Sequence, residues 1–173
     1  MTETTMASPE FSNYASKYSQ IPFSKKATYT ILSAGLIGEI AVEFIAWVVV
    51  PIFLHRPMEP SVLIQNLASA QFGIALPMTV AFPLHFFAGA YGFVLFYMFF
   101  VDAFKIHNVT VAGIIWGLML WVTAQGFFAP LAGRPFFLGF QVYSWWSILL
   151  HVGMTVPTAL AFEFFGRKFE NVS

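Results

Sequence analysis

The stretch ATYTILSAGLIGEIAVEFIAWVVVPIFL, residues 27–54, decides the fold. It is an almost continuous apolar run, and it exceeds the roughly 20 helical residues that a bilayer core requires. Near its middle stand Glu39 and Glu43, four residues apart and therefore on one face of a helix. A charged side chain at that depth costs roughly 2.5–3.5 kcal/mol on insertion scales. We therefore expect both acids to face protein rather than lipid.

The composition extends this interpretation to the whole chain. Of 173 residues, 58% are hydrophobic and 9% are charged, and the mean hydropathy is +0.75. These values lie outside the usual range of soluble domains. We predict an all-α, polytopic membrane protein, a bundle of four transmembrane helices over residues 27–54, 77–101, 109–130 and 142–165.

The remaining segments are too polar to span. Residues 57–73, PMEPSVLIQNLASAQFG, predict an interfacial helix or re-entrant loop between the first two spans, with Pro57 and Pro60 near its start. Residues 1–26 are expected to be a polar cytoplasmic tail and 166–173 a short second tail. The first 24 residues lack a basic region followed by an apolar core, so they do not resemble a cleavable signal peptide.

The basic residues predict the orientation, because lysine and arginine concentrate in cytoplasmic loops. Four crossings put the termini and the loop between the second and third spans on one side. That side holds Lys17, Lys25, Lys26, Lys105, Arg167 and Lys168, whereas the other side holds only Arg56 and Arg134. We expect the chain in the cell (inner) membrane with both termini in the cytoplasm.

Several function classes find no support. The chain has no cysteine and a formal net charge of zero, which excludes thiolate-held clusters and gives no basic patch for nucleic acid. We find no nucleophile motif, phosphate loop or metalloprotease spacing. The chain is therefore not expected to be an enzyme on its own.

Two apolar stretches resemble each other. AGLIGEIAVEFIAWVVVPIFLHRP (34–57) aligns without a gap with AGIIWGLMLWVTAQGFFAPLAGRP (112–135). A parallel duplication of two-helix units would produce this pattern, and so would chance similarity between apolar helices. Both explanations stay open.

Polar and small residues share one face on each predicted helix, which is typical of contacts between membrane helices. The four faces are Gly35, Glu39, Glu43 and Ala46; His85, Ala88, Gly89 and Gly92; Gly113, Gly117, Trp121 and Gln125; and Ser144, Ser147, His151, Thr155 and Thr158. At about 1.5 Å per residue, Glu43, His85, Gln125 and His151 all fall in the outer half of the membrane. Glu39 lies one turn deeper.

We therefore predict a buried polar cluster of Glu39, Glu43, His85, Gln125 and His151, with at least one acid protonated. The cluster could simply hydrogen-bond the helices into register. Alternatively, His85 and His151 could ligate haem b or a chlorophyll-type pigment, or hydrogen-bond a quinone headgroup, and Ala88, Gly89 and Gly92 would leave space for a porphyrin ring. With the two acids, the histidines could also hold iron, manganese or zinc.

The aromatic content suggests partners. The chain has 22 phenylalanines, more than a small bundle can bury, so many must face lipid or other membrane subunits. We expect an accessory subunit of a larger membrane redox complex, of oxidase or monooxygenase type, with bound lipids. A haem b or quinone-linked electron-transfer protein and a small proton-coupled carrier are the alternatives.

The motifs HFFAGAYG (85–92), GIIWGLMLW (113–121), APLAGRPFF (129–137) and LLHVG (149–153) resemble a family of small four-helix membrane proteins of unassigned function. The resemblance covers about residues 80–165. It implies the four-helix architecture and the pairing of His85 with His151, and it implies nothing about a substrate.

Overall fold

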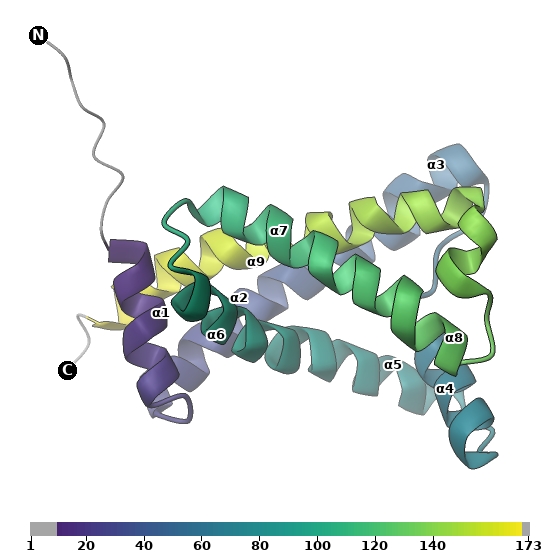
Figure 1. Cartoon of the computed structure of the whole chain (residues 1–173), viewed down its shortest axis with the longest axis horizontal. Coiled ribbons are helices and arrows are strands. Elements are labelled where there is room, and N and C mark those ends of the chain that lie inside the picture. The colour runs from purple at the N-terminus through teal and green to yellow at the C-terminus, as the bar shows by residue number, and fades with distance from the viewer. Residues whose placement is uncertain (1–9, 171–173) are drawn as a thin grey trace, which may run out of the picture.

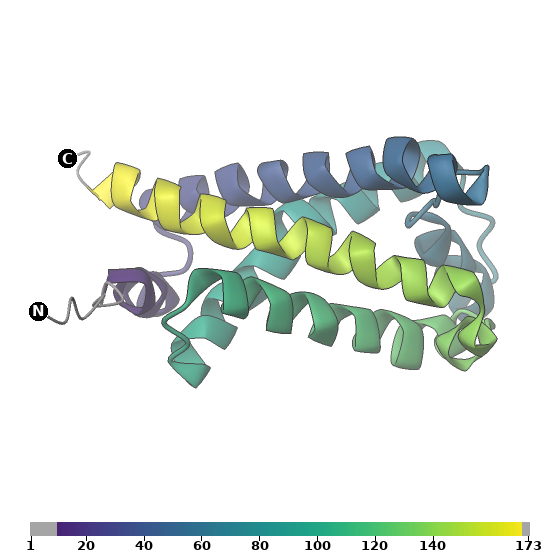
Figure 2. The ribbon, with the colours of Figure 1, turned by 90° about the horizontal axis from the view of Figure 1, so that it is seen from above.

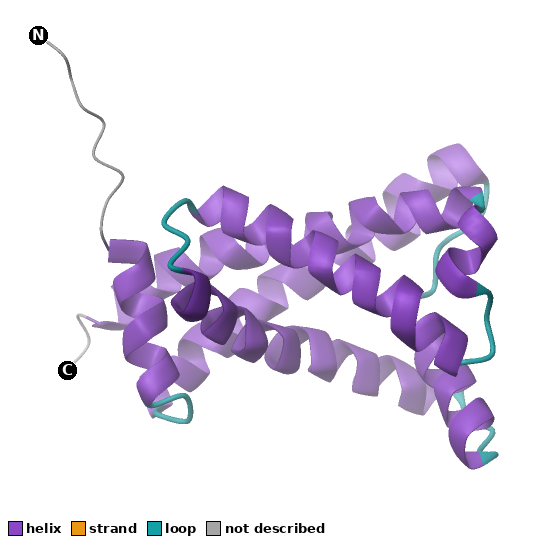
Figure 3. Ribbon diagram, in the orientation of Figure 1, coloured by secondary structure: helices purple, strands orange, loops and turns teal. Residues whose placement is uncertain are grey.

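The computed structural model describes residues 10–170, which form a bundle of long helices (Figure 1). All the described residues lie in helices, turns and loops (Figure 3). Four helical stretches are long and apolar enough to cross a membrane: Lys25–Leu54, Met78–Phe104, Val109–Leu131 and Val142–Phe169. Their bounds differ from the predicted spans by only a few residues. The all-α, four-helix architecture predicted from the sequence is therefore confirmed.

Three of the four spans contain a π-helical segment. The spans are α2 (Lys25–Phe44), η1 (Ile45–Val49) and α3 (Val50–Leu54); α5 (Met78–Phe87), η2 (Ala88–Phe93) and α6 (Val94–Phe104); α7 (Val109–Thr123), η3 (Ala124–Phe128) and α8 (Ala129–Leu131); and the single helix α9 (Val142–Glu170). Isolated π-helical turns are rare and occur frequently at functional sites.

Prolines lie shortly after two of these π segments. Proline has no N–H, so the carbonyl four residues before it loses its α-helical partner. Pro51 and Pro130 come two residues after the ends of η1 and η3, each in the first turn of the next short helix. At η1 the N–H of Val50 donates to the carbonyl of Ile45, five residues back rather than four. The first, second and third spans all have this α–π–α order, so the order does not distinguish the two spans that the internal alignment pairs.

Helix α9 packs between α2 and α7 (Figure 2), and small residues permit the close approach. A Cβ at Gly38 of α2 would overlap the hydroxyl of Thr158, and a Cβ at Gly117 of α7 would overlap that of Thr155. The Thr155 hydroxyl also donates a 2.7 Å hydrogen bond to the carbonyl of Gly113. Close backbone contact and an interhelical hydrogen bond are the usual means by which membrane helices associate.

The two ends of the bundle carry different elements. Helix α1 (Glu10–Gln20), within the predicted N-terminal tail, packs on α6 and α9 with Ala15 and Tyr18 buried. The hydroxyl of Ser19 bonds Asp102 at 2.7 Å. At the opposite end lie α3, α8 and the short helix α4 (Val62–Phe72), the segment predicted to be interfacial (Figure 1).

Candidate metal centre

Three of the predicted cluster residues meet inside the bundle. Glu39 and Glu43 project from α2 and His85 from α5, and one potential ligand atom from each lies within 4.8 Å of the others. The two acids are one helical turn apart, and His85 comes from the neighbouring span. The sequence prediction that the acids face protein is met at Glu39, which is fully buried.

Both carboxylate oxygens of Glu39 are buried and have no hydrogen-bond partner among the described residues. A buried carboxyl group without a partner is costly, since the low-dielectric interior does not replace the water it has lost. The backbone of Gly89 in η2 makes room for the group, because a Cβ there would overlap Oε1 of Glu39. Gly89, which the sequence suggested would leave space for a porphyrin ring, instead accommodates this carboxylate.

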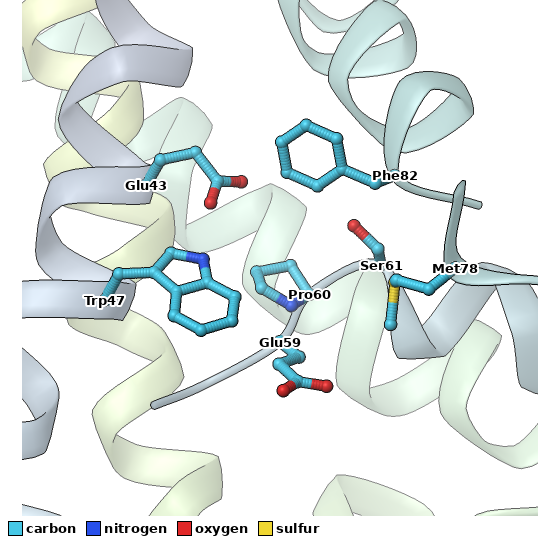
Figure 4. Close-up of a pocket in the computed structure, with 7 residues that line it drawn as sticks. All are labelled: Glu43, Trp47, Glu59, Pro60, Ser61, Met78 and Phe82. Carbon is cyan, nitrogen blue, oxygen red and sulfur yellow. The ribbon is translucent and has the colours of Figure 1, made fainter. Parts of the chain in front are cut away.

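Glu43 and His85 are partly buried and complete the group. Oε1 of Glu43 and Nδ1 of His85 are both shielded from solvent and lack a hydrogen-bond partner within the described part of the chain. Trp47 lies one turn beyond Glu43, with the nitrogen edge of its indole toward the carboxylate (Figure 4). The three neighbouring side chains thus carry four buried polar atoms that lack a hydrogen-bond partner among the described residues.

His151, on α9, does not belong to this three-residue group, although it was predicted to pair with His85. Its Nδ1 lies 2.6 Å from the carbonyl oxygen of Ser147. A carbonyl can only accept, so Nδ1 carries the proton and Nε2 presents its lone pair. An imidazole whose second nitrogen is held by a backbone carbonyl is typical of metal-binding histidines.

Gln125 belongs to the hydrogen-bond network beside His151 rather than to the three-residue group. Its amide donates to the hydroxyl of Ser147 at 3.3 Å, and the indole of Trp121 donates to the same hydroxyl at 3.0 Å. That hydroxyl donates in turn to the carbonyl of Ser144 at 2.6 Å. Ser147 thus connects α7 and η3 to the turn of α9 that carries His151.

A small cavity of ≈ 100 Å³ adjoins the group through Glu43 (Figure 4). Its other lining residues are Trp47, Glu59, Pro60, Ser61, Met78 and Phe82. Sequence reasoning missed Trp47 and Glu59 as parts of the site. The available signals were weak: Trp47 shares the face of Glu43, and Glu59 is the only acid in the loop between the first two spans.

Chemically, the group suits a divalent transition ion. Carboxylate and neutral imidazole together are ligands for iron, manganese and zinc. Three or four side chains would leave coordination positions free for water or another small ligand. Pockets for drug-sized ligands measure about 300–1,000 Å³, so the adjoining cavity of ≈ 100 Å³ suits an ion and its water better than a porphyrin.

No protein-family model, no curated protein and no solved structure matches this chain. The resemblance carried by the motif HFFAGAYG and its companions therefore stays a prediction. The chain's own geometry is therefore what indicates its function.

Proposed function

We propose that this chain is an integral membrane protein that binds one divalent transition-metal ion between its helices, with Glu39, Glu43 and His85 as ligands. One observation carries the proposal: donor atoms of three side chains, from two spans, lie within 4.8 Å of one another. Buried atoms on all three side chains have no other partner among the described residues. A bound cation would accept electron pairs from these atoms and so take the place of the missing hydrogen-bond partners.

The charge balance supports the same conclusion. Two carboxylates one helical turn apart repel each other, and burial strengthens the repulsion. A shared proton removes one charge, but it leaves several acceptor lone pairs without donors. A divalent cation neutralises both carboxylates and accepts electron pairs from both and from the imidazole. We therefore favour an ion over a shared proton.

His151 is the best candidate for a fourth ligand. Its Nδ1 is engaged by the Ser147 carbonyl, which leaves the Nε2 lone pair to face a ligand, and α9 packs against α2, which carries both acids. The network through Gln125 and Trp121 holds Ser147 and thereby the orientation of the imidazole. Two carboxylates and two imidazoles would favour iron or manganese, the ions that support redox chemistry with such ligands.

The test is metal binding by the purified full-length chain. We expect Co²⁺, used as a spectroscopic probe, to bind at one ion per chain and to give ligand-field absorption bands. Glu39→Gln and His85→Ala should each abolish these bands, whereas Glu163→Gln, at the other end of α9, should retain them. A Soret band that disappears in His85→Ala and in His151→Ala would support haem b instead.

A role as an accessory subunit of a larger membrane redox complex is our second proposal. The observation behind it is the turn η4 (Phe136–Phe140), where Phe137, Leu138 and Phe140 adopt left-handed backbone angles. Such angles cost roughly 1–2 kcal/mol each in residues with a side chain. They hold Phe136 and Phe140 exposed at the end of the bundle.

Exposed rings on a strained turn suit a protein contact. Purification in a mild detergent should recover the chain together with other membrane subunits. Phe136→Ala with Phe140→Ala should release those subunits without changing Co²⁺ binding. Phe96→Ala, which removes an exposed ring near the start of α6, is the matched control. Recovery of the chain alone would contradict this second proposal.

A further inference from the structure

The π segment η1 leaves one backbone carbonyl without a helical partner. In an α-helix, the carbonyl of Ala46 would accept from the N–H of Val50, but that N–H donates to Ile45 instead. The next possible donor, residue 51, is a proline and has no N–H. The carbonyl of Ala46 must therefore find a partner outside its helix, since an unsatisfied backbone group within a membrane is costly.

The partner is the loop that follows the first span. The N–H of Met58 donates to the Ala46 carbonyl at 3.2 Å. This bond ties the loop back along η1, next to Trp47 and one turn from Glu43. Glu59, Pro60 and Ser61, which follow Met58 directly, line the cavity together with Glu43. The π segment η1 thus holds in place the loop residues that line the cavity.

Two carboxylates, Glu59 and Glu43, line the cavity, and Glu39 lies one helical turn beyond Glu43. Glu59 is exposed, Glu43 is partly buried, and Glu39 is fully buried. Glu43 and Glu59 lie on opposite sides of Pro60, with Phe82 and Met78 from α5 forming the facing wall (Figure 4). A volume of ≈ 100 Å³ has room for a few water molecules or for an ion with part of its hydration shell.

We propose that this cavity is the access route by which a hydrated divalent cation reaches the site, with Glu59 as the residue that captures it and Glu43 as the next ligand. The inference rests on the proposed metal site. An exposed carboxylate at the mouth raises the local cation concentration, and the partly apolar wall focuses its field. Glu43 belongs both to the cavity and to the three-residue group, so an ion can pass to Glu39 and His85 without leaving carboxylate contact.

Glu59 should affect the rate constants of Co²⁺ binding rather than the Kd for Co²⁺. A group that guides an ion inward also guides it outward, so removing it slows association and dissociation together. We expect Glu59→Gln to lower the association rate constant for Co²⁺ by about three- to tenfold, and Glu59→Lys by about tenfold or more. The Kd should stay within about threefold of the wild-type value, because Glu59 is not a ligand in the bound state.

Stopped-flow absorption of the Co²⁺ bands, with the whole chain in nanodiscs, measures both rate constants. Glu163→Gln and Glu163→Lys are matched controls, since they make the same charge changes at the far end of α9 and should leave the rates unchanged. The wild-type association rate should also fall with added salt, and this dependence should weaken in Glu59→Gln.

Two results would overturn the access route while leaving the metal site intact. One is an unchanged association rate in both Glu59 variants. The other is a tenfold weaker Kd caused by faster dissociation, which would make Glu59 a ligand. Failure of the wild-type chain to bind Co²⁺ would instead remove the metal site, and the route with it.

Discussion

The backbone of Gly89 packs directly against the carboxylate of Glu39. A Cβ at position 89 of η2 would overlap Oε1 of Glu39. The two residues belong to different spans, so the buried carboxylate depends on the absence of a side chain on its neighbour. Gly92 lies in the same π segment, and a Cβ there would meet nothing within 4 Å. These two glycines therefore form a matched pair for testing the site.

Gly89→Ala should weaken metal binding without unfolding the bundle. The added methyl group must displace the Glu39 carboxylate, and a misplaced ligand commonly costs one to two orders of magnitude in metal affinity. We expect a Kd for Co²⁺ about tenfold or more weaker, measured by titration of the absorption bands. Gly92→Ala should bind as the wild type does. Equal binding by the two variants would show that Glu39 is not a ligand.

Glu39→Gln should abolish metal binding without lowering the stability of the metal-free protein. Without a bound ion, the carboxylate of Glu39 would be buried with no hydrogen-bond partner among the described residues. A neutral amide avoids the burial of a charge, so the metal-free variant should unfold at the same temperature as the wild type or at a higher one. The wild type alone should gain stability from added Mn²⁺, by about 2.7 kcal/mol at a concentration one hundred times Kd.

Thermal unfolding followed by circular dichroism, with and without Mn²⁺, measures both effects. Ile40→Gln, on the exposed side of the same helix, is a control for the introduction of an amide into α2. A lower unfolding temperature in metal-free Glu39→Gln would indicate that the carboxyl group stabilises the bundle through protein contacts.

The sequence was sufficient for the four helices and for part of the site. Long apolar runs have few structural alternatives in a membrane, so the spans could be predicted to within a few residues. The helical period placed Glu39 and Glu43 on one face, and the cost of lipid exposure turned that face inward. Comparable depth on adjacent helices then brought His85 to the acids.

The rest of the site depends on backbone irregularities that composition and periodicity do not reveal. Nothing in the residue pattern shows that Val50 bonds Ile45 rather than Ala46, and this shift is what ties Met58 and the cavity wall to η1. The sequence pattern predicted that Gln125 faces the interior. Its hydrogen bond to Ser147 depends on how α9 is rotated relative to η3, which the pattern does not show. Helix α1 was not predicted, because it lies in the polar segment that was expected to be a tail.

Thr155→Val should loosen the contact between α7 and α9. The substitution keeps the shape of the side chain and removes the hydroxyl that bonds the Gly113 carbonyl. Interhelical hydrogen bonds in membranes contribute about 0.6 kcal/mol on average and up to about 1.7, so we expect a loss within that range, measured by denaturant-induced unfolding in mixed micelles. Thr123→Val is the control, because its hydroxyl bonds only Met119 of its own span. Equal losses would indicate that the hydroxyl of Thr155 acts through its bond to the His151 carbonyl within α9 rather than through Gly113.

Pro51→Ala should release the loop that closes the cavity. The new N–H at residue 51 can donate to Ala46 or to Trp47, and the first of these bonds competes with the N–H of Met58. We expect faster amide hydrogen exchange over residues 57–61, measured by mass spectrometry. The Co²⁺ association rate should rise along with it, because the route widens when its wall detaches.

Pro130→Ala makes the same change after η3, where the only such bond among the described residues is the local one from Ala132 N–H to the Phe128 carbonyl, and should leave exchange in residues 57–61 unaltered. Unchanged exchange in Pro51→Ala would show that the Ala46 carbonyl keeps Met58 even when a helical donor is offered. The loop would then be held by its own packing, and the proline would serve only to end the span.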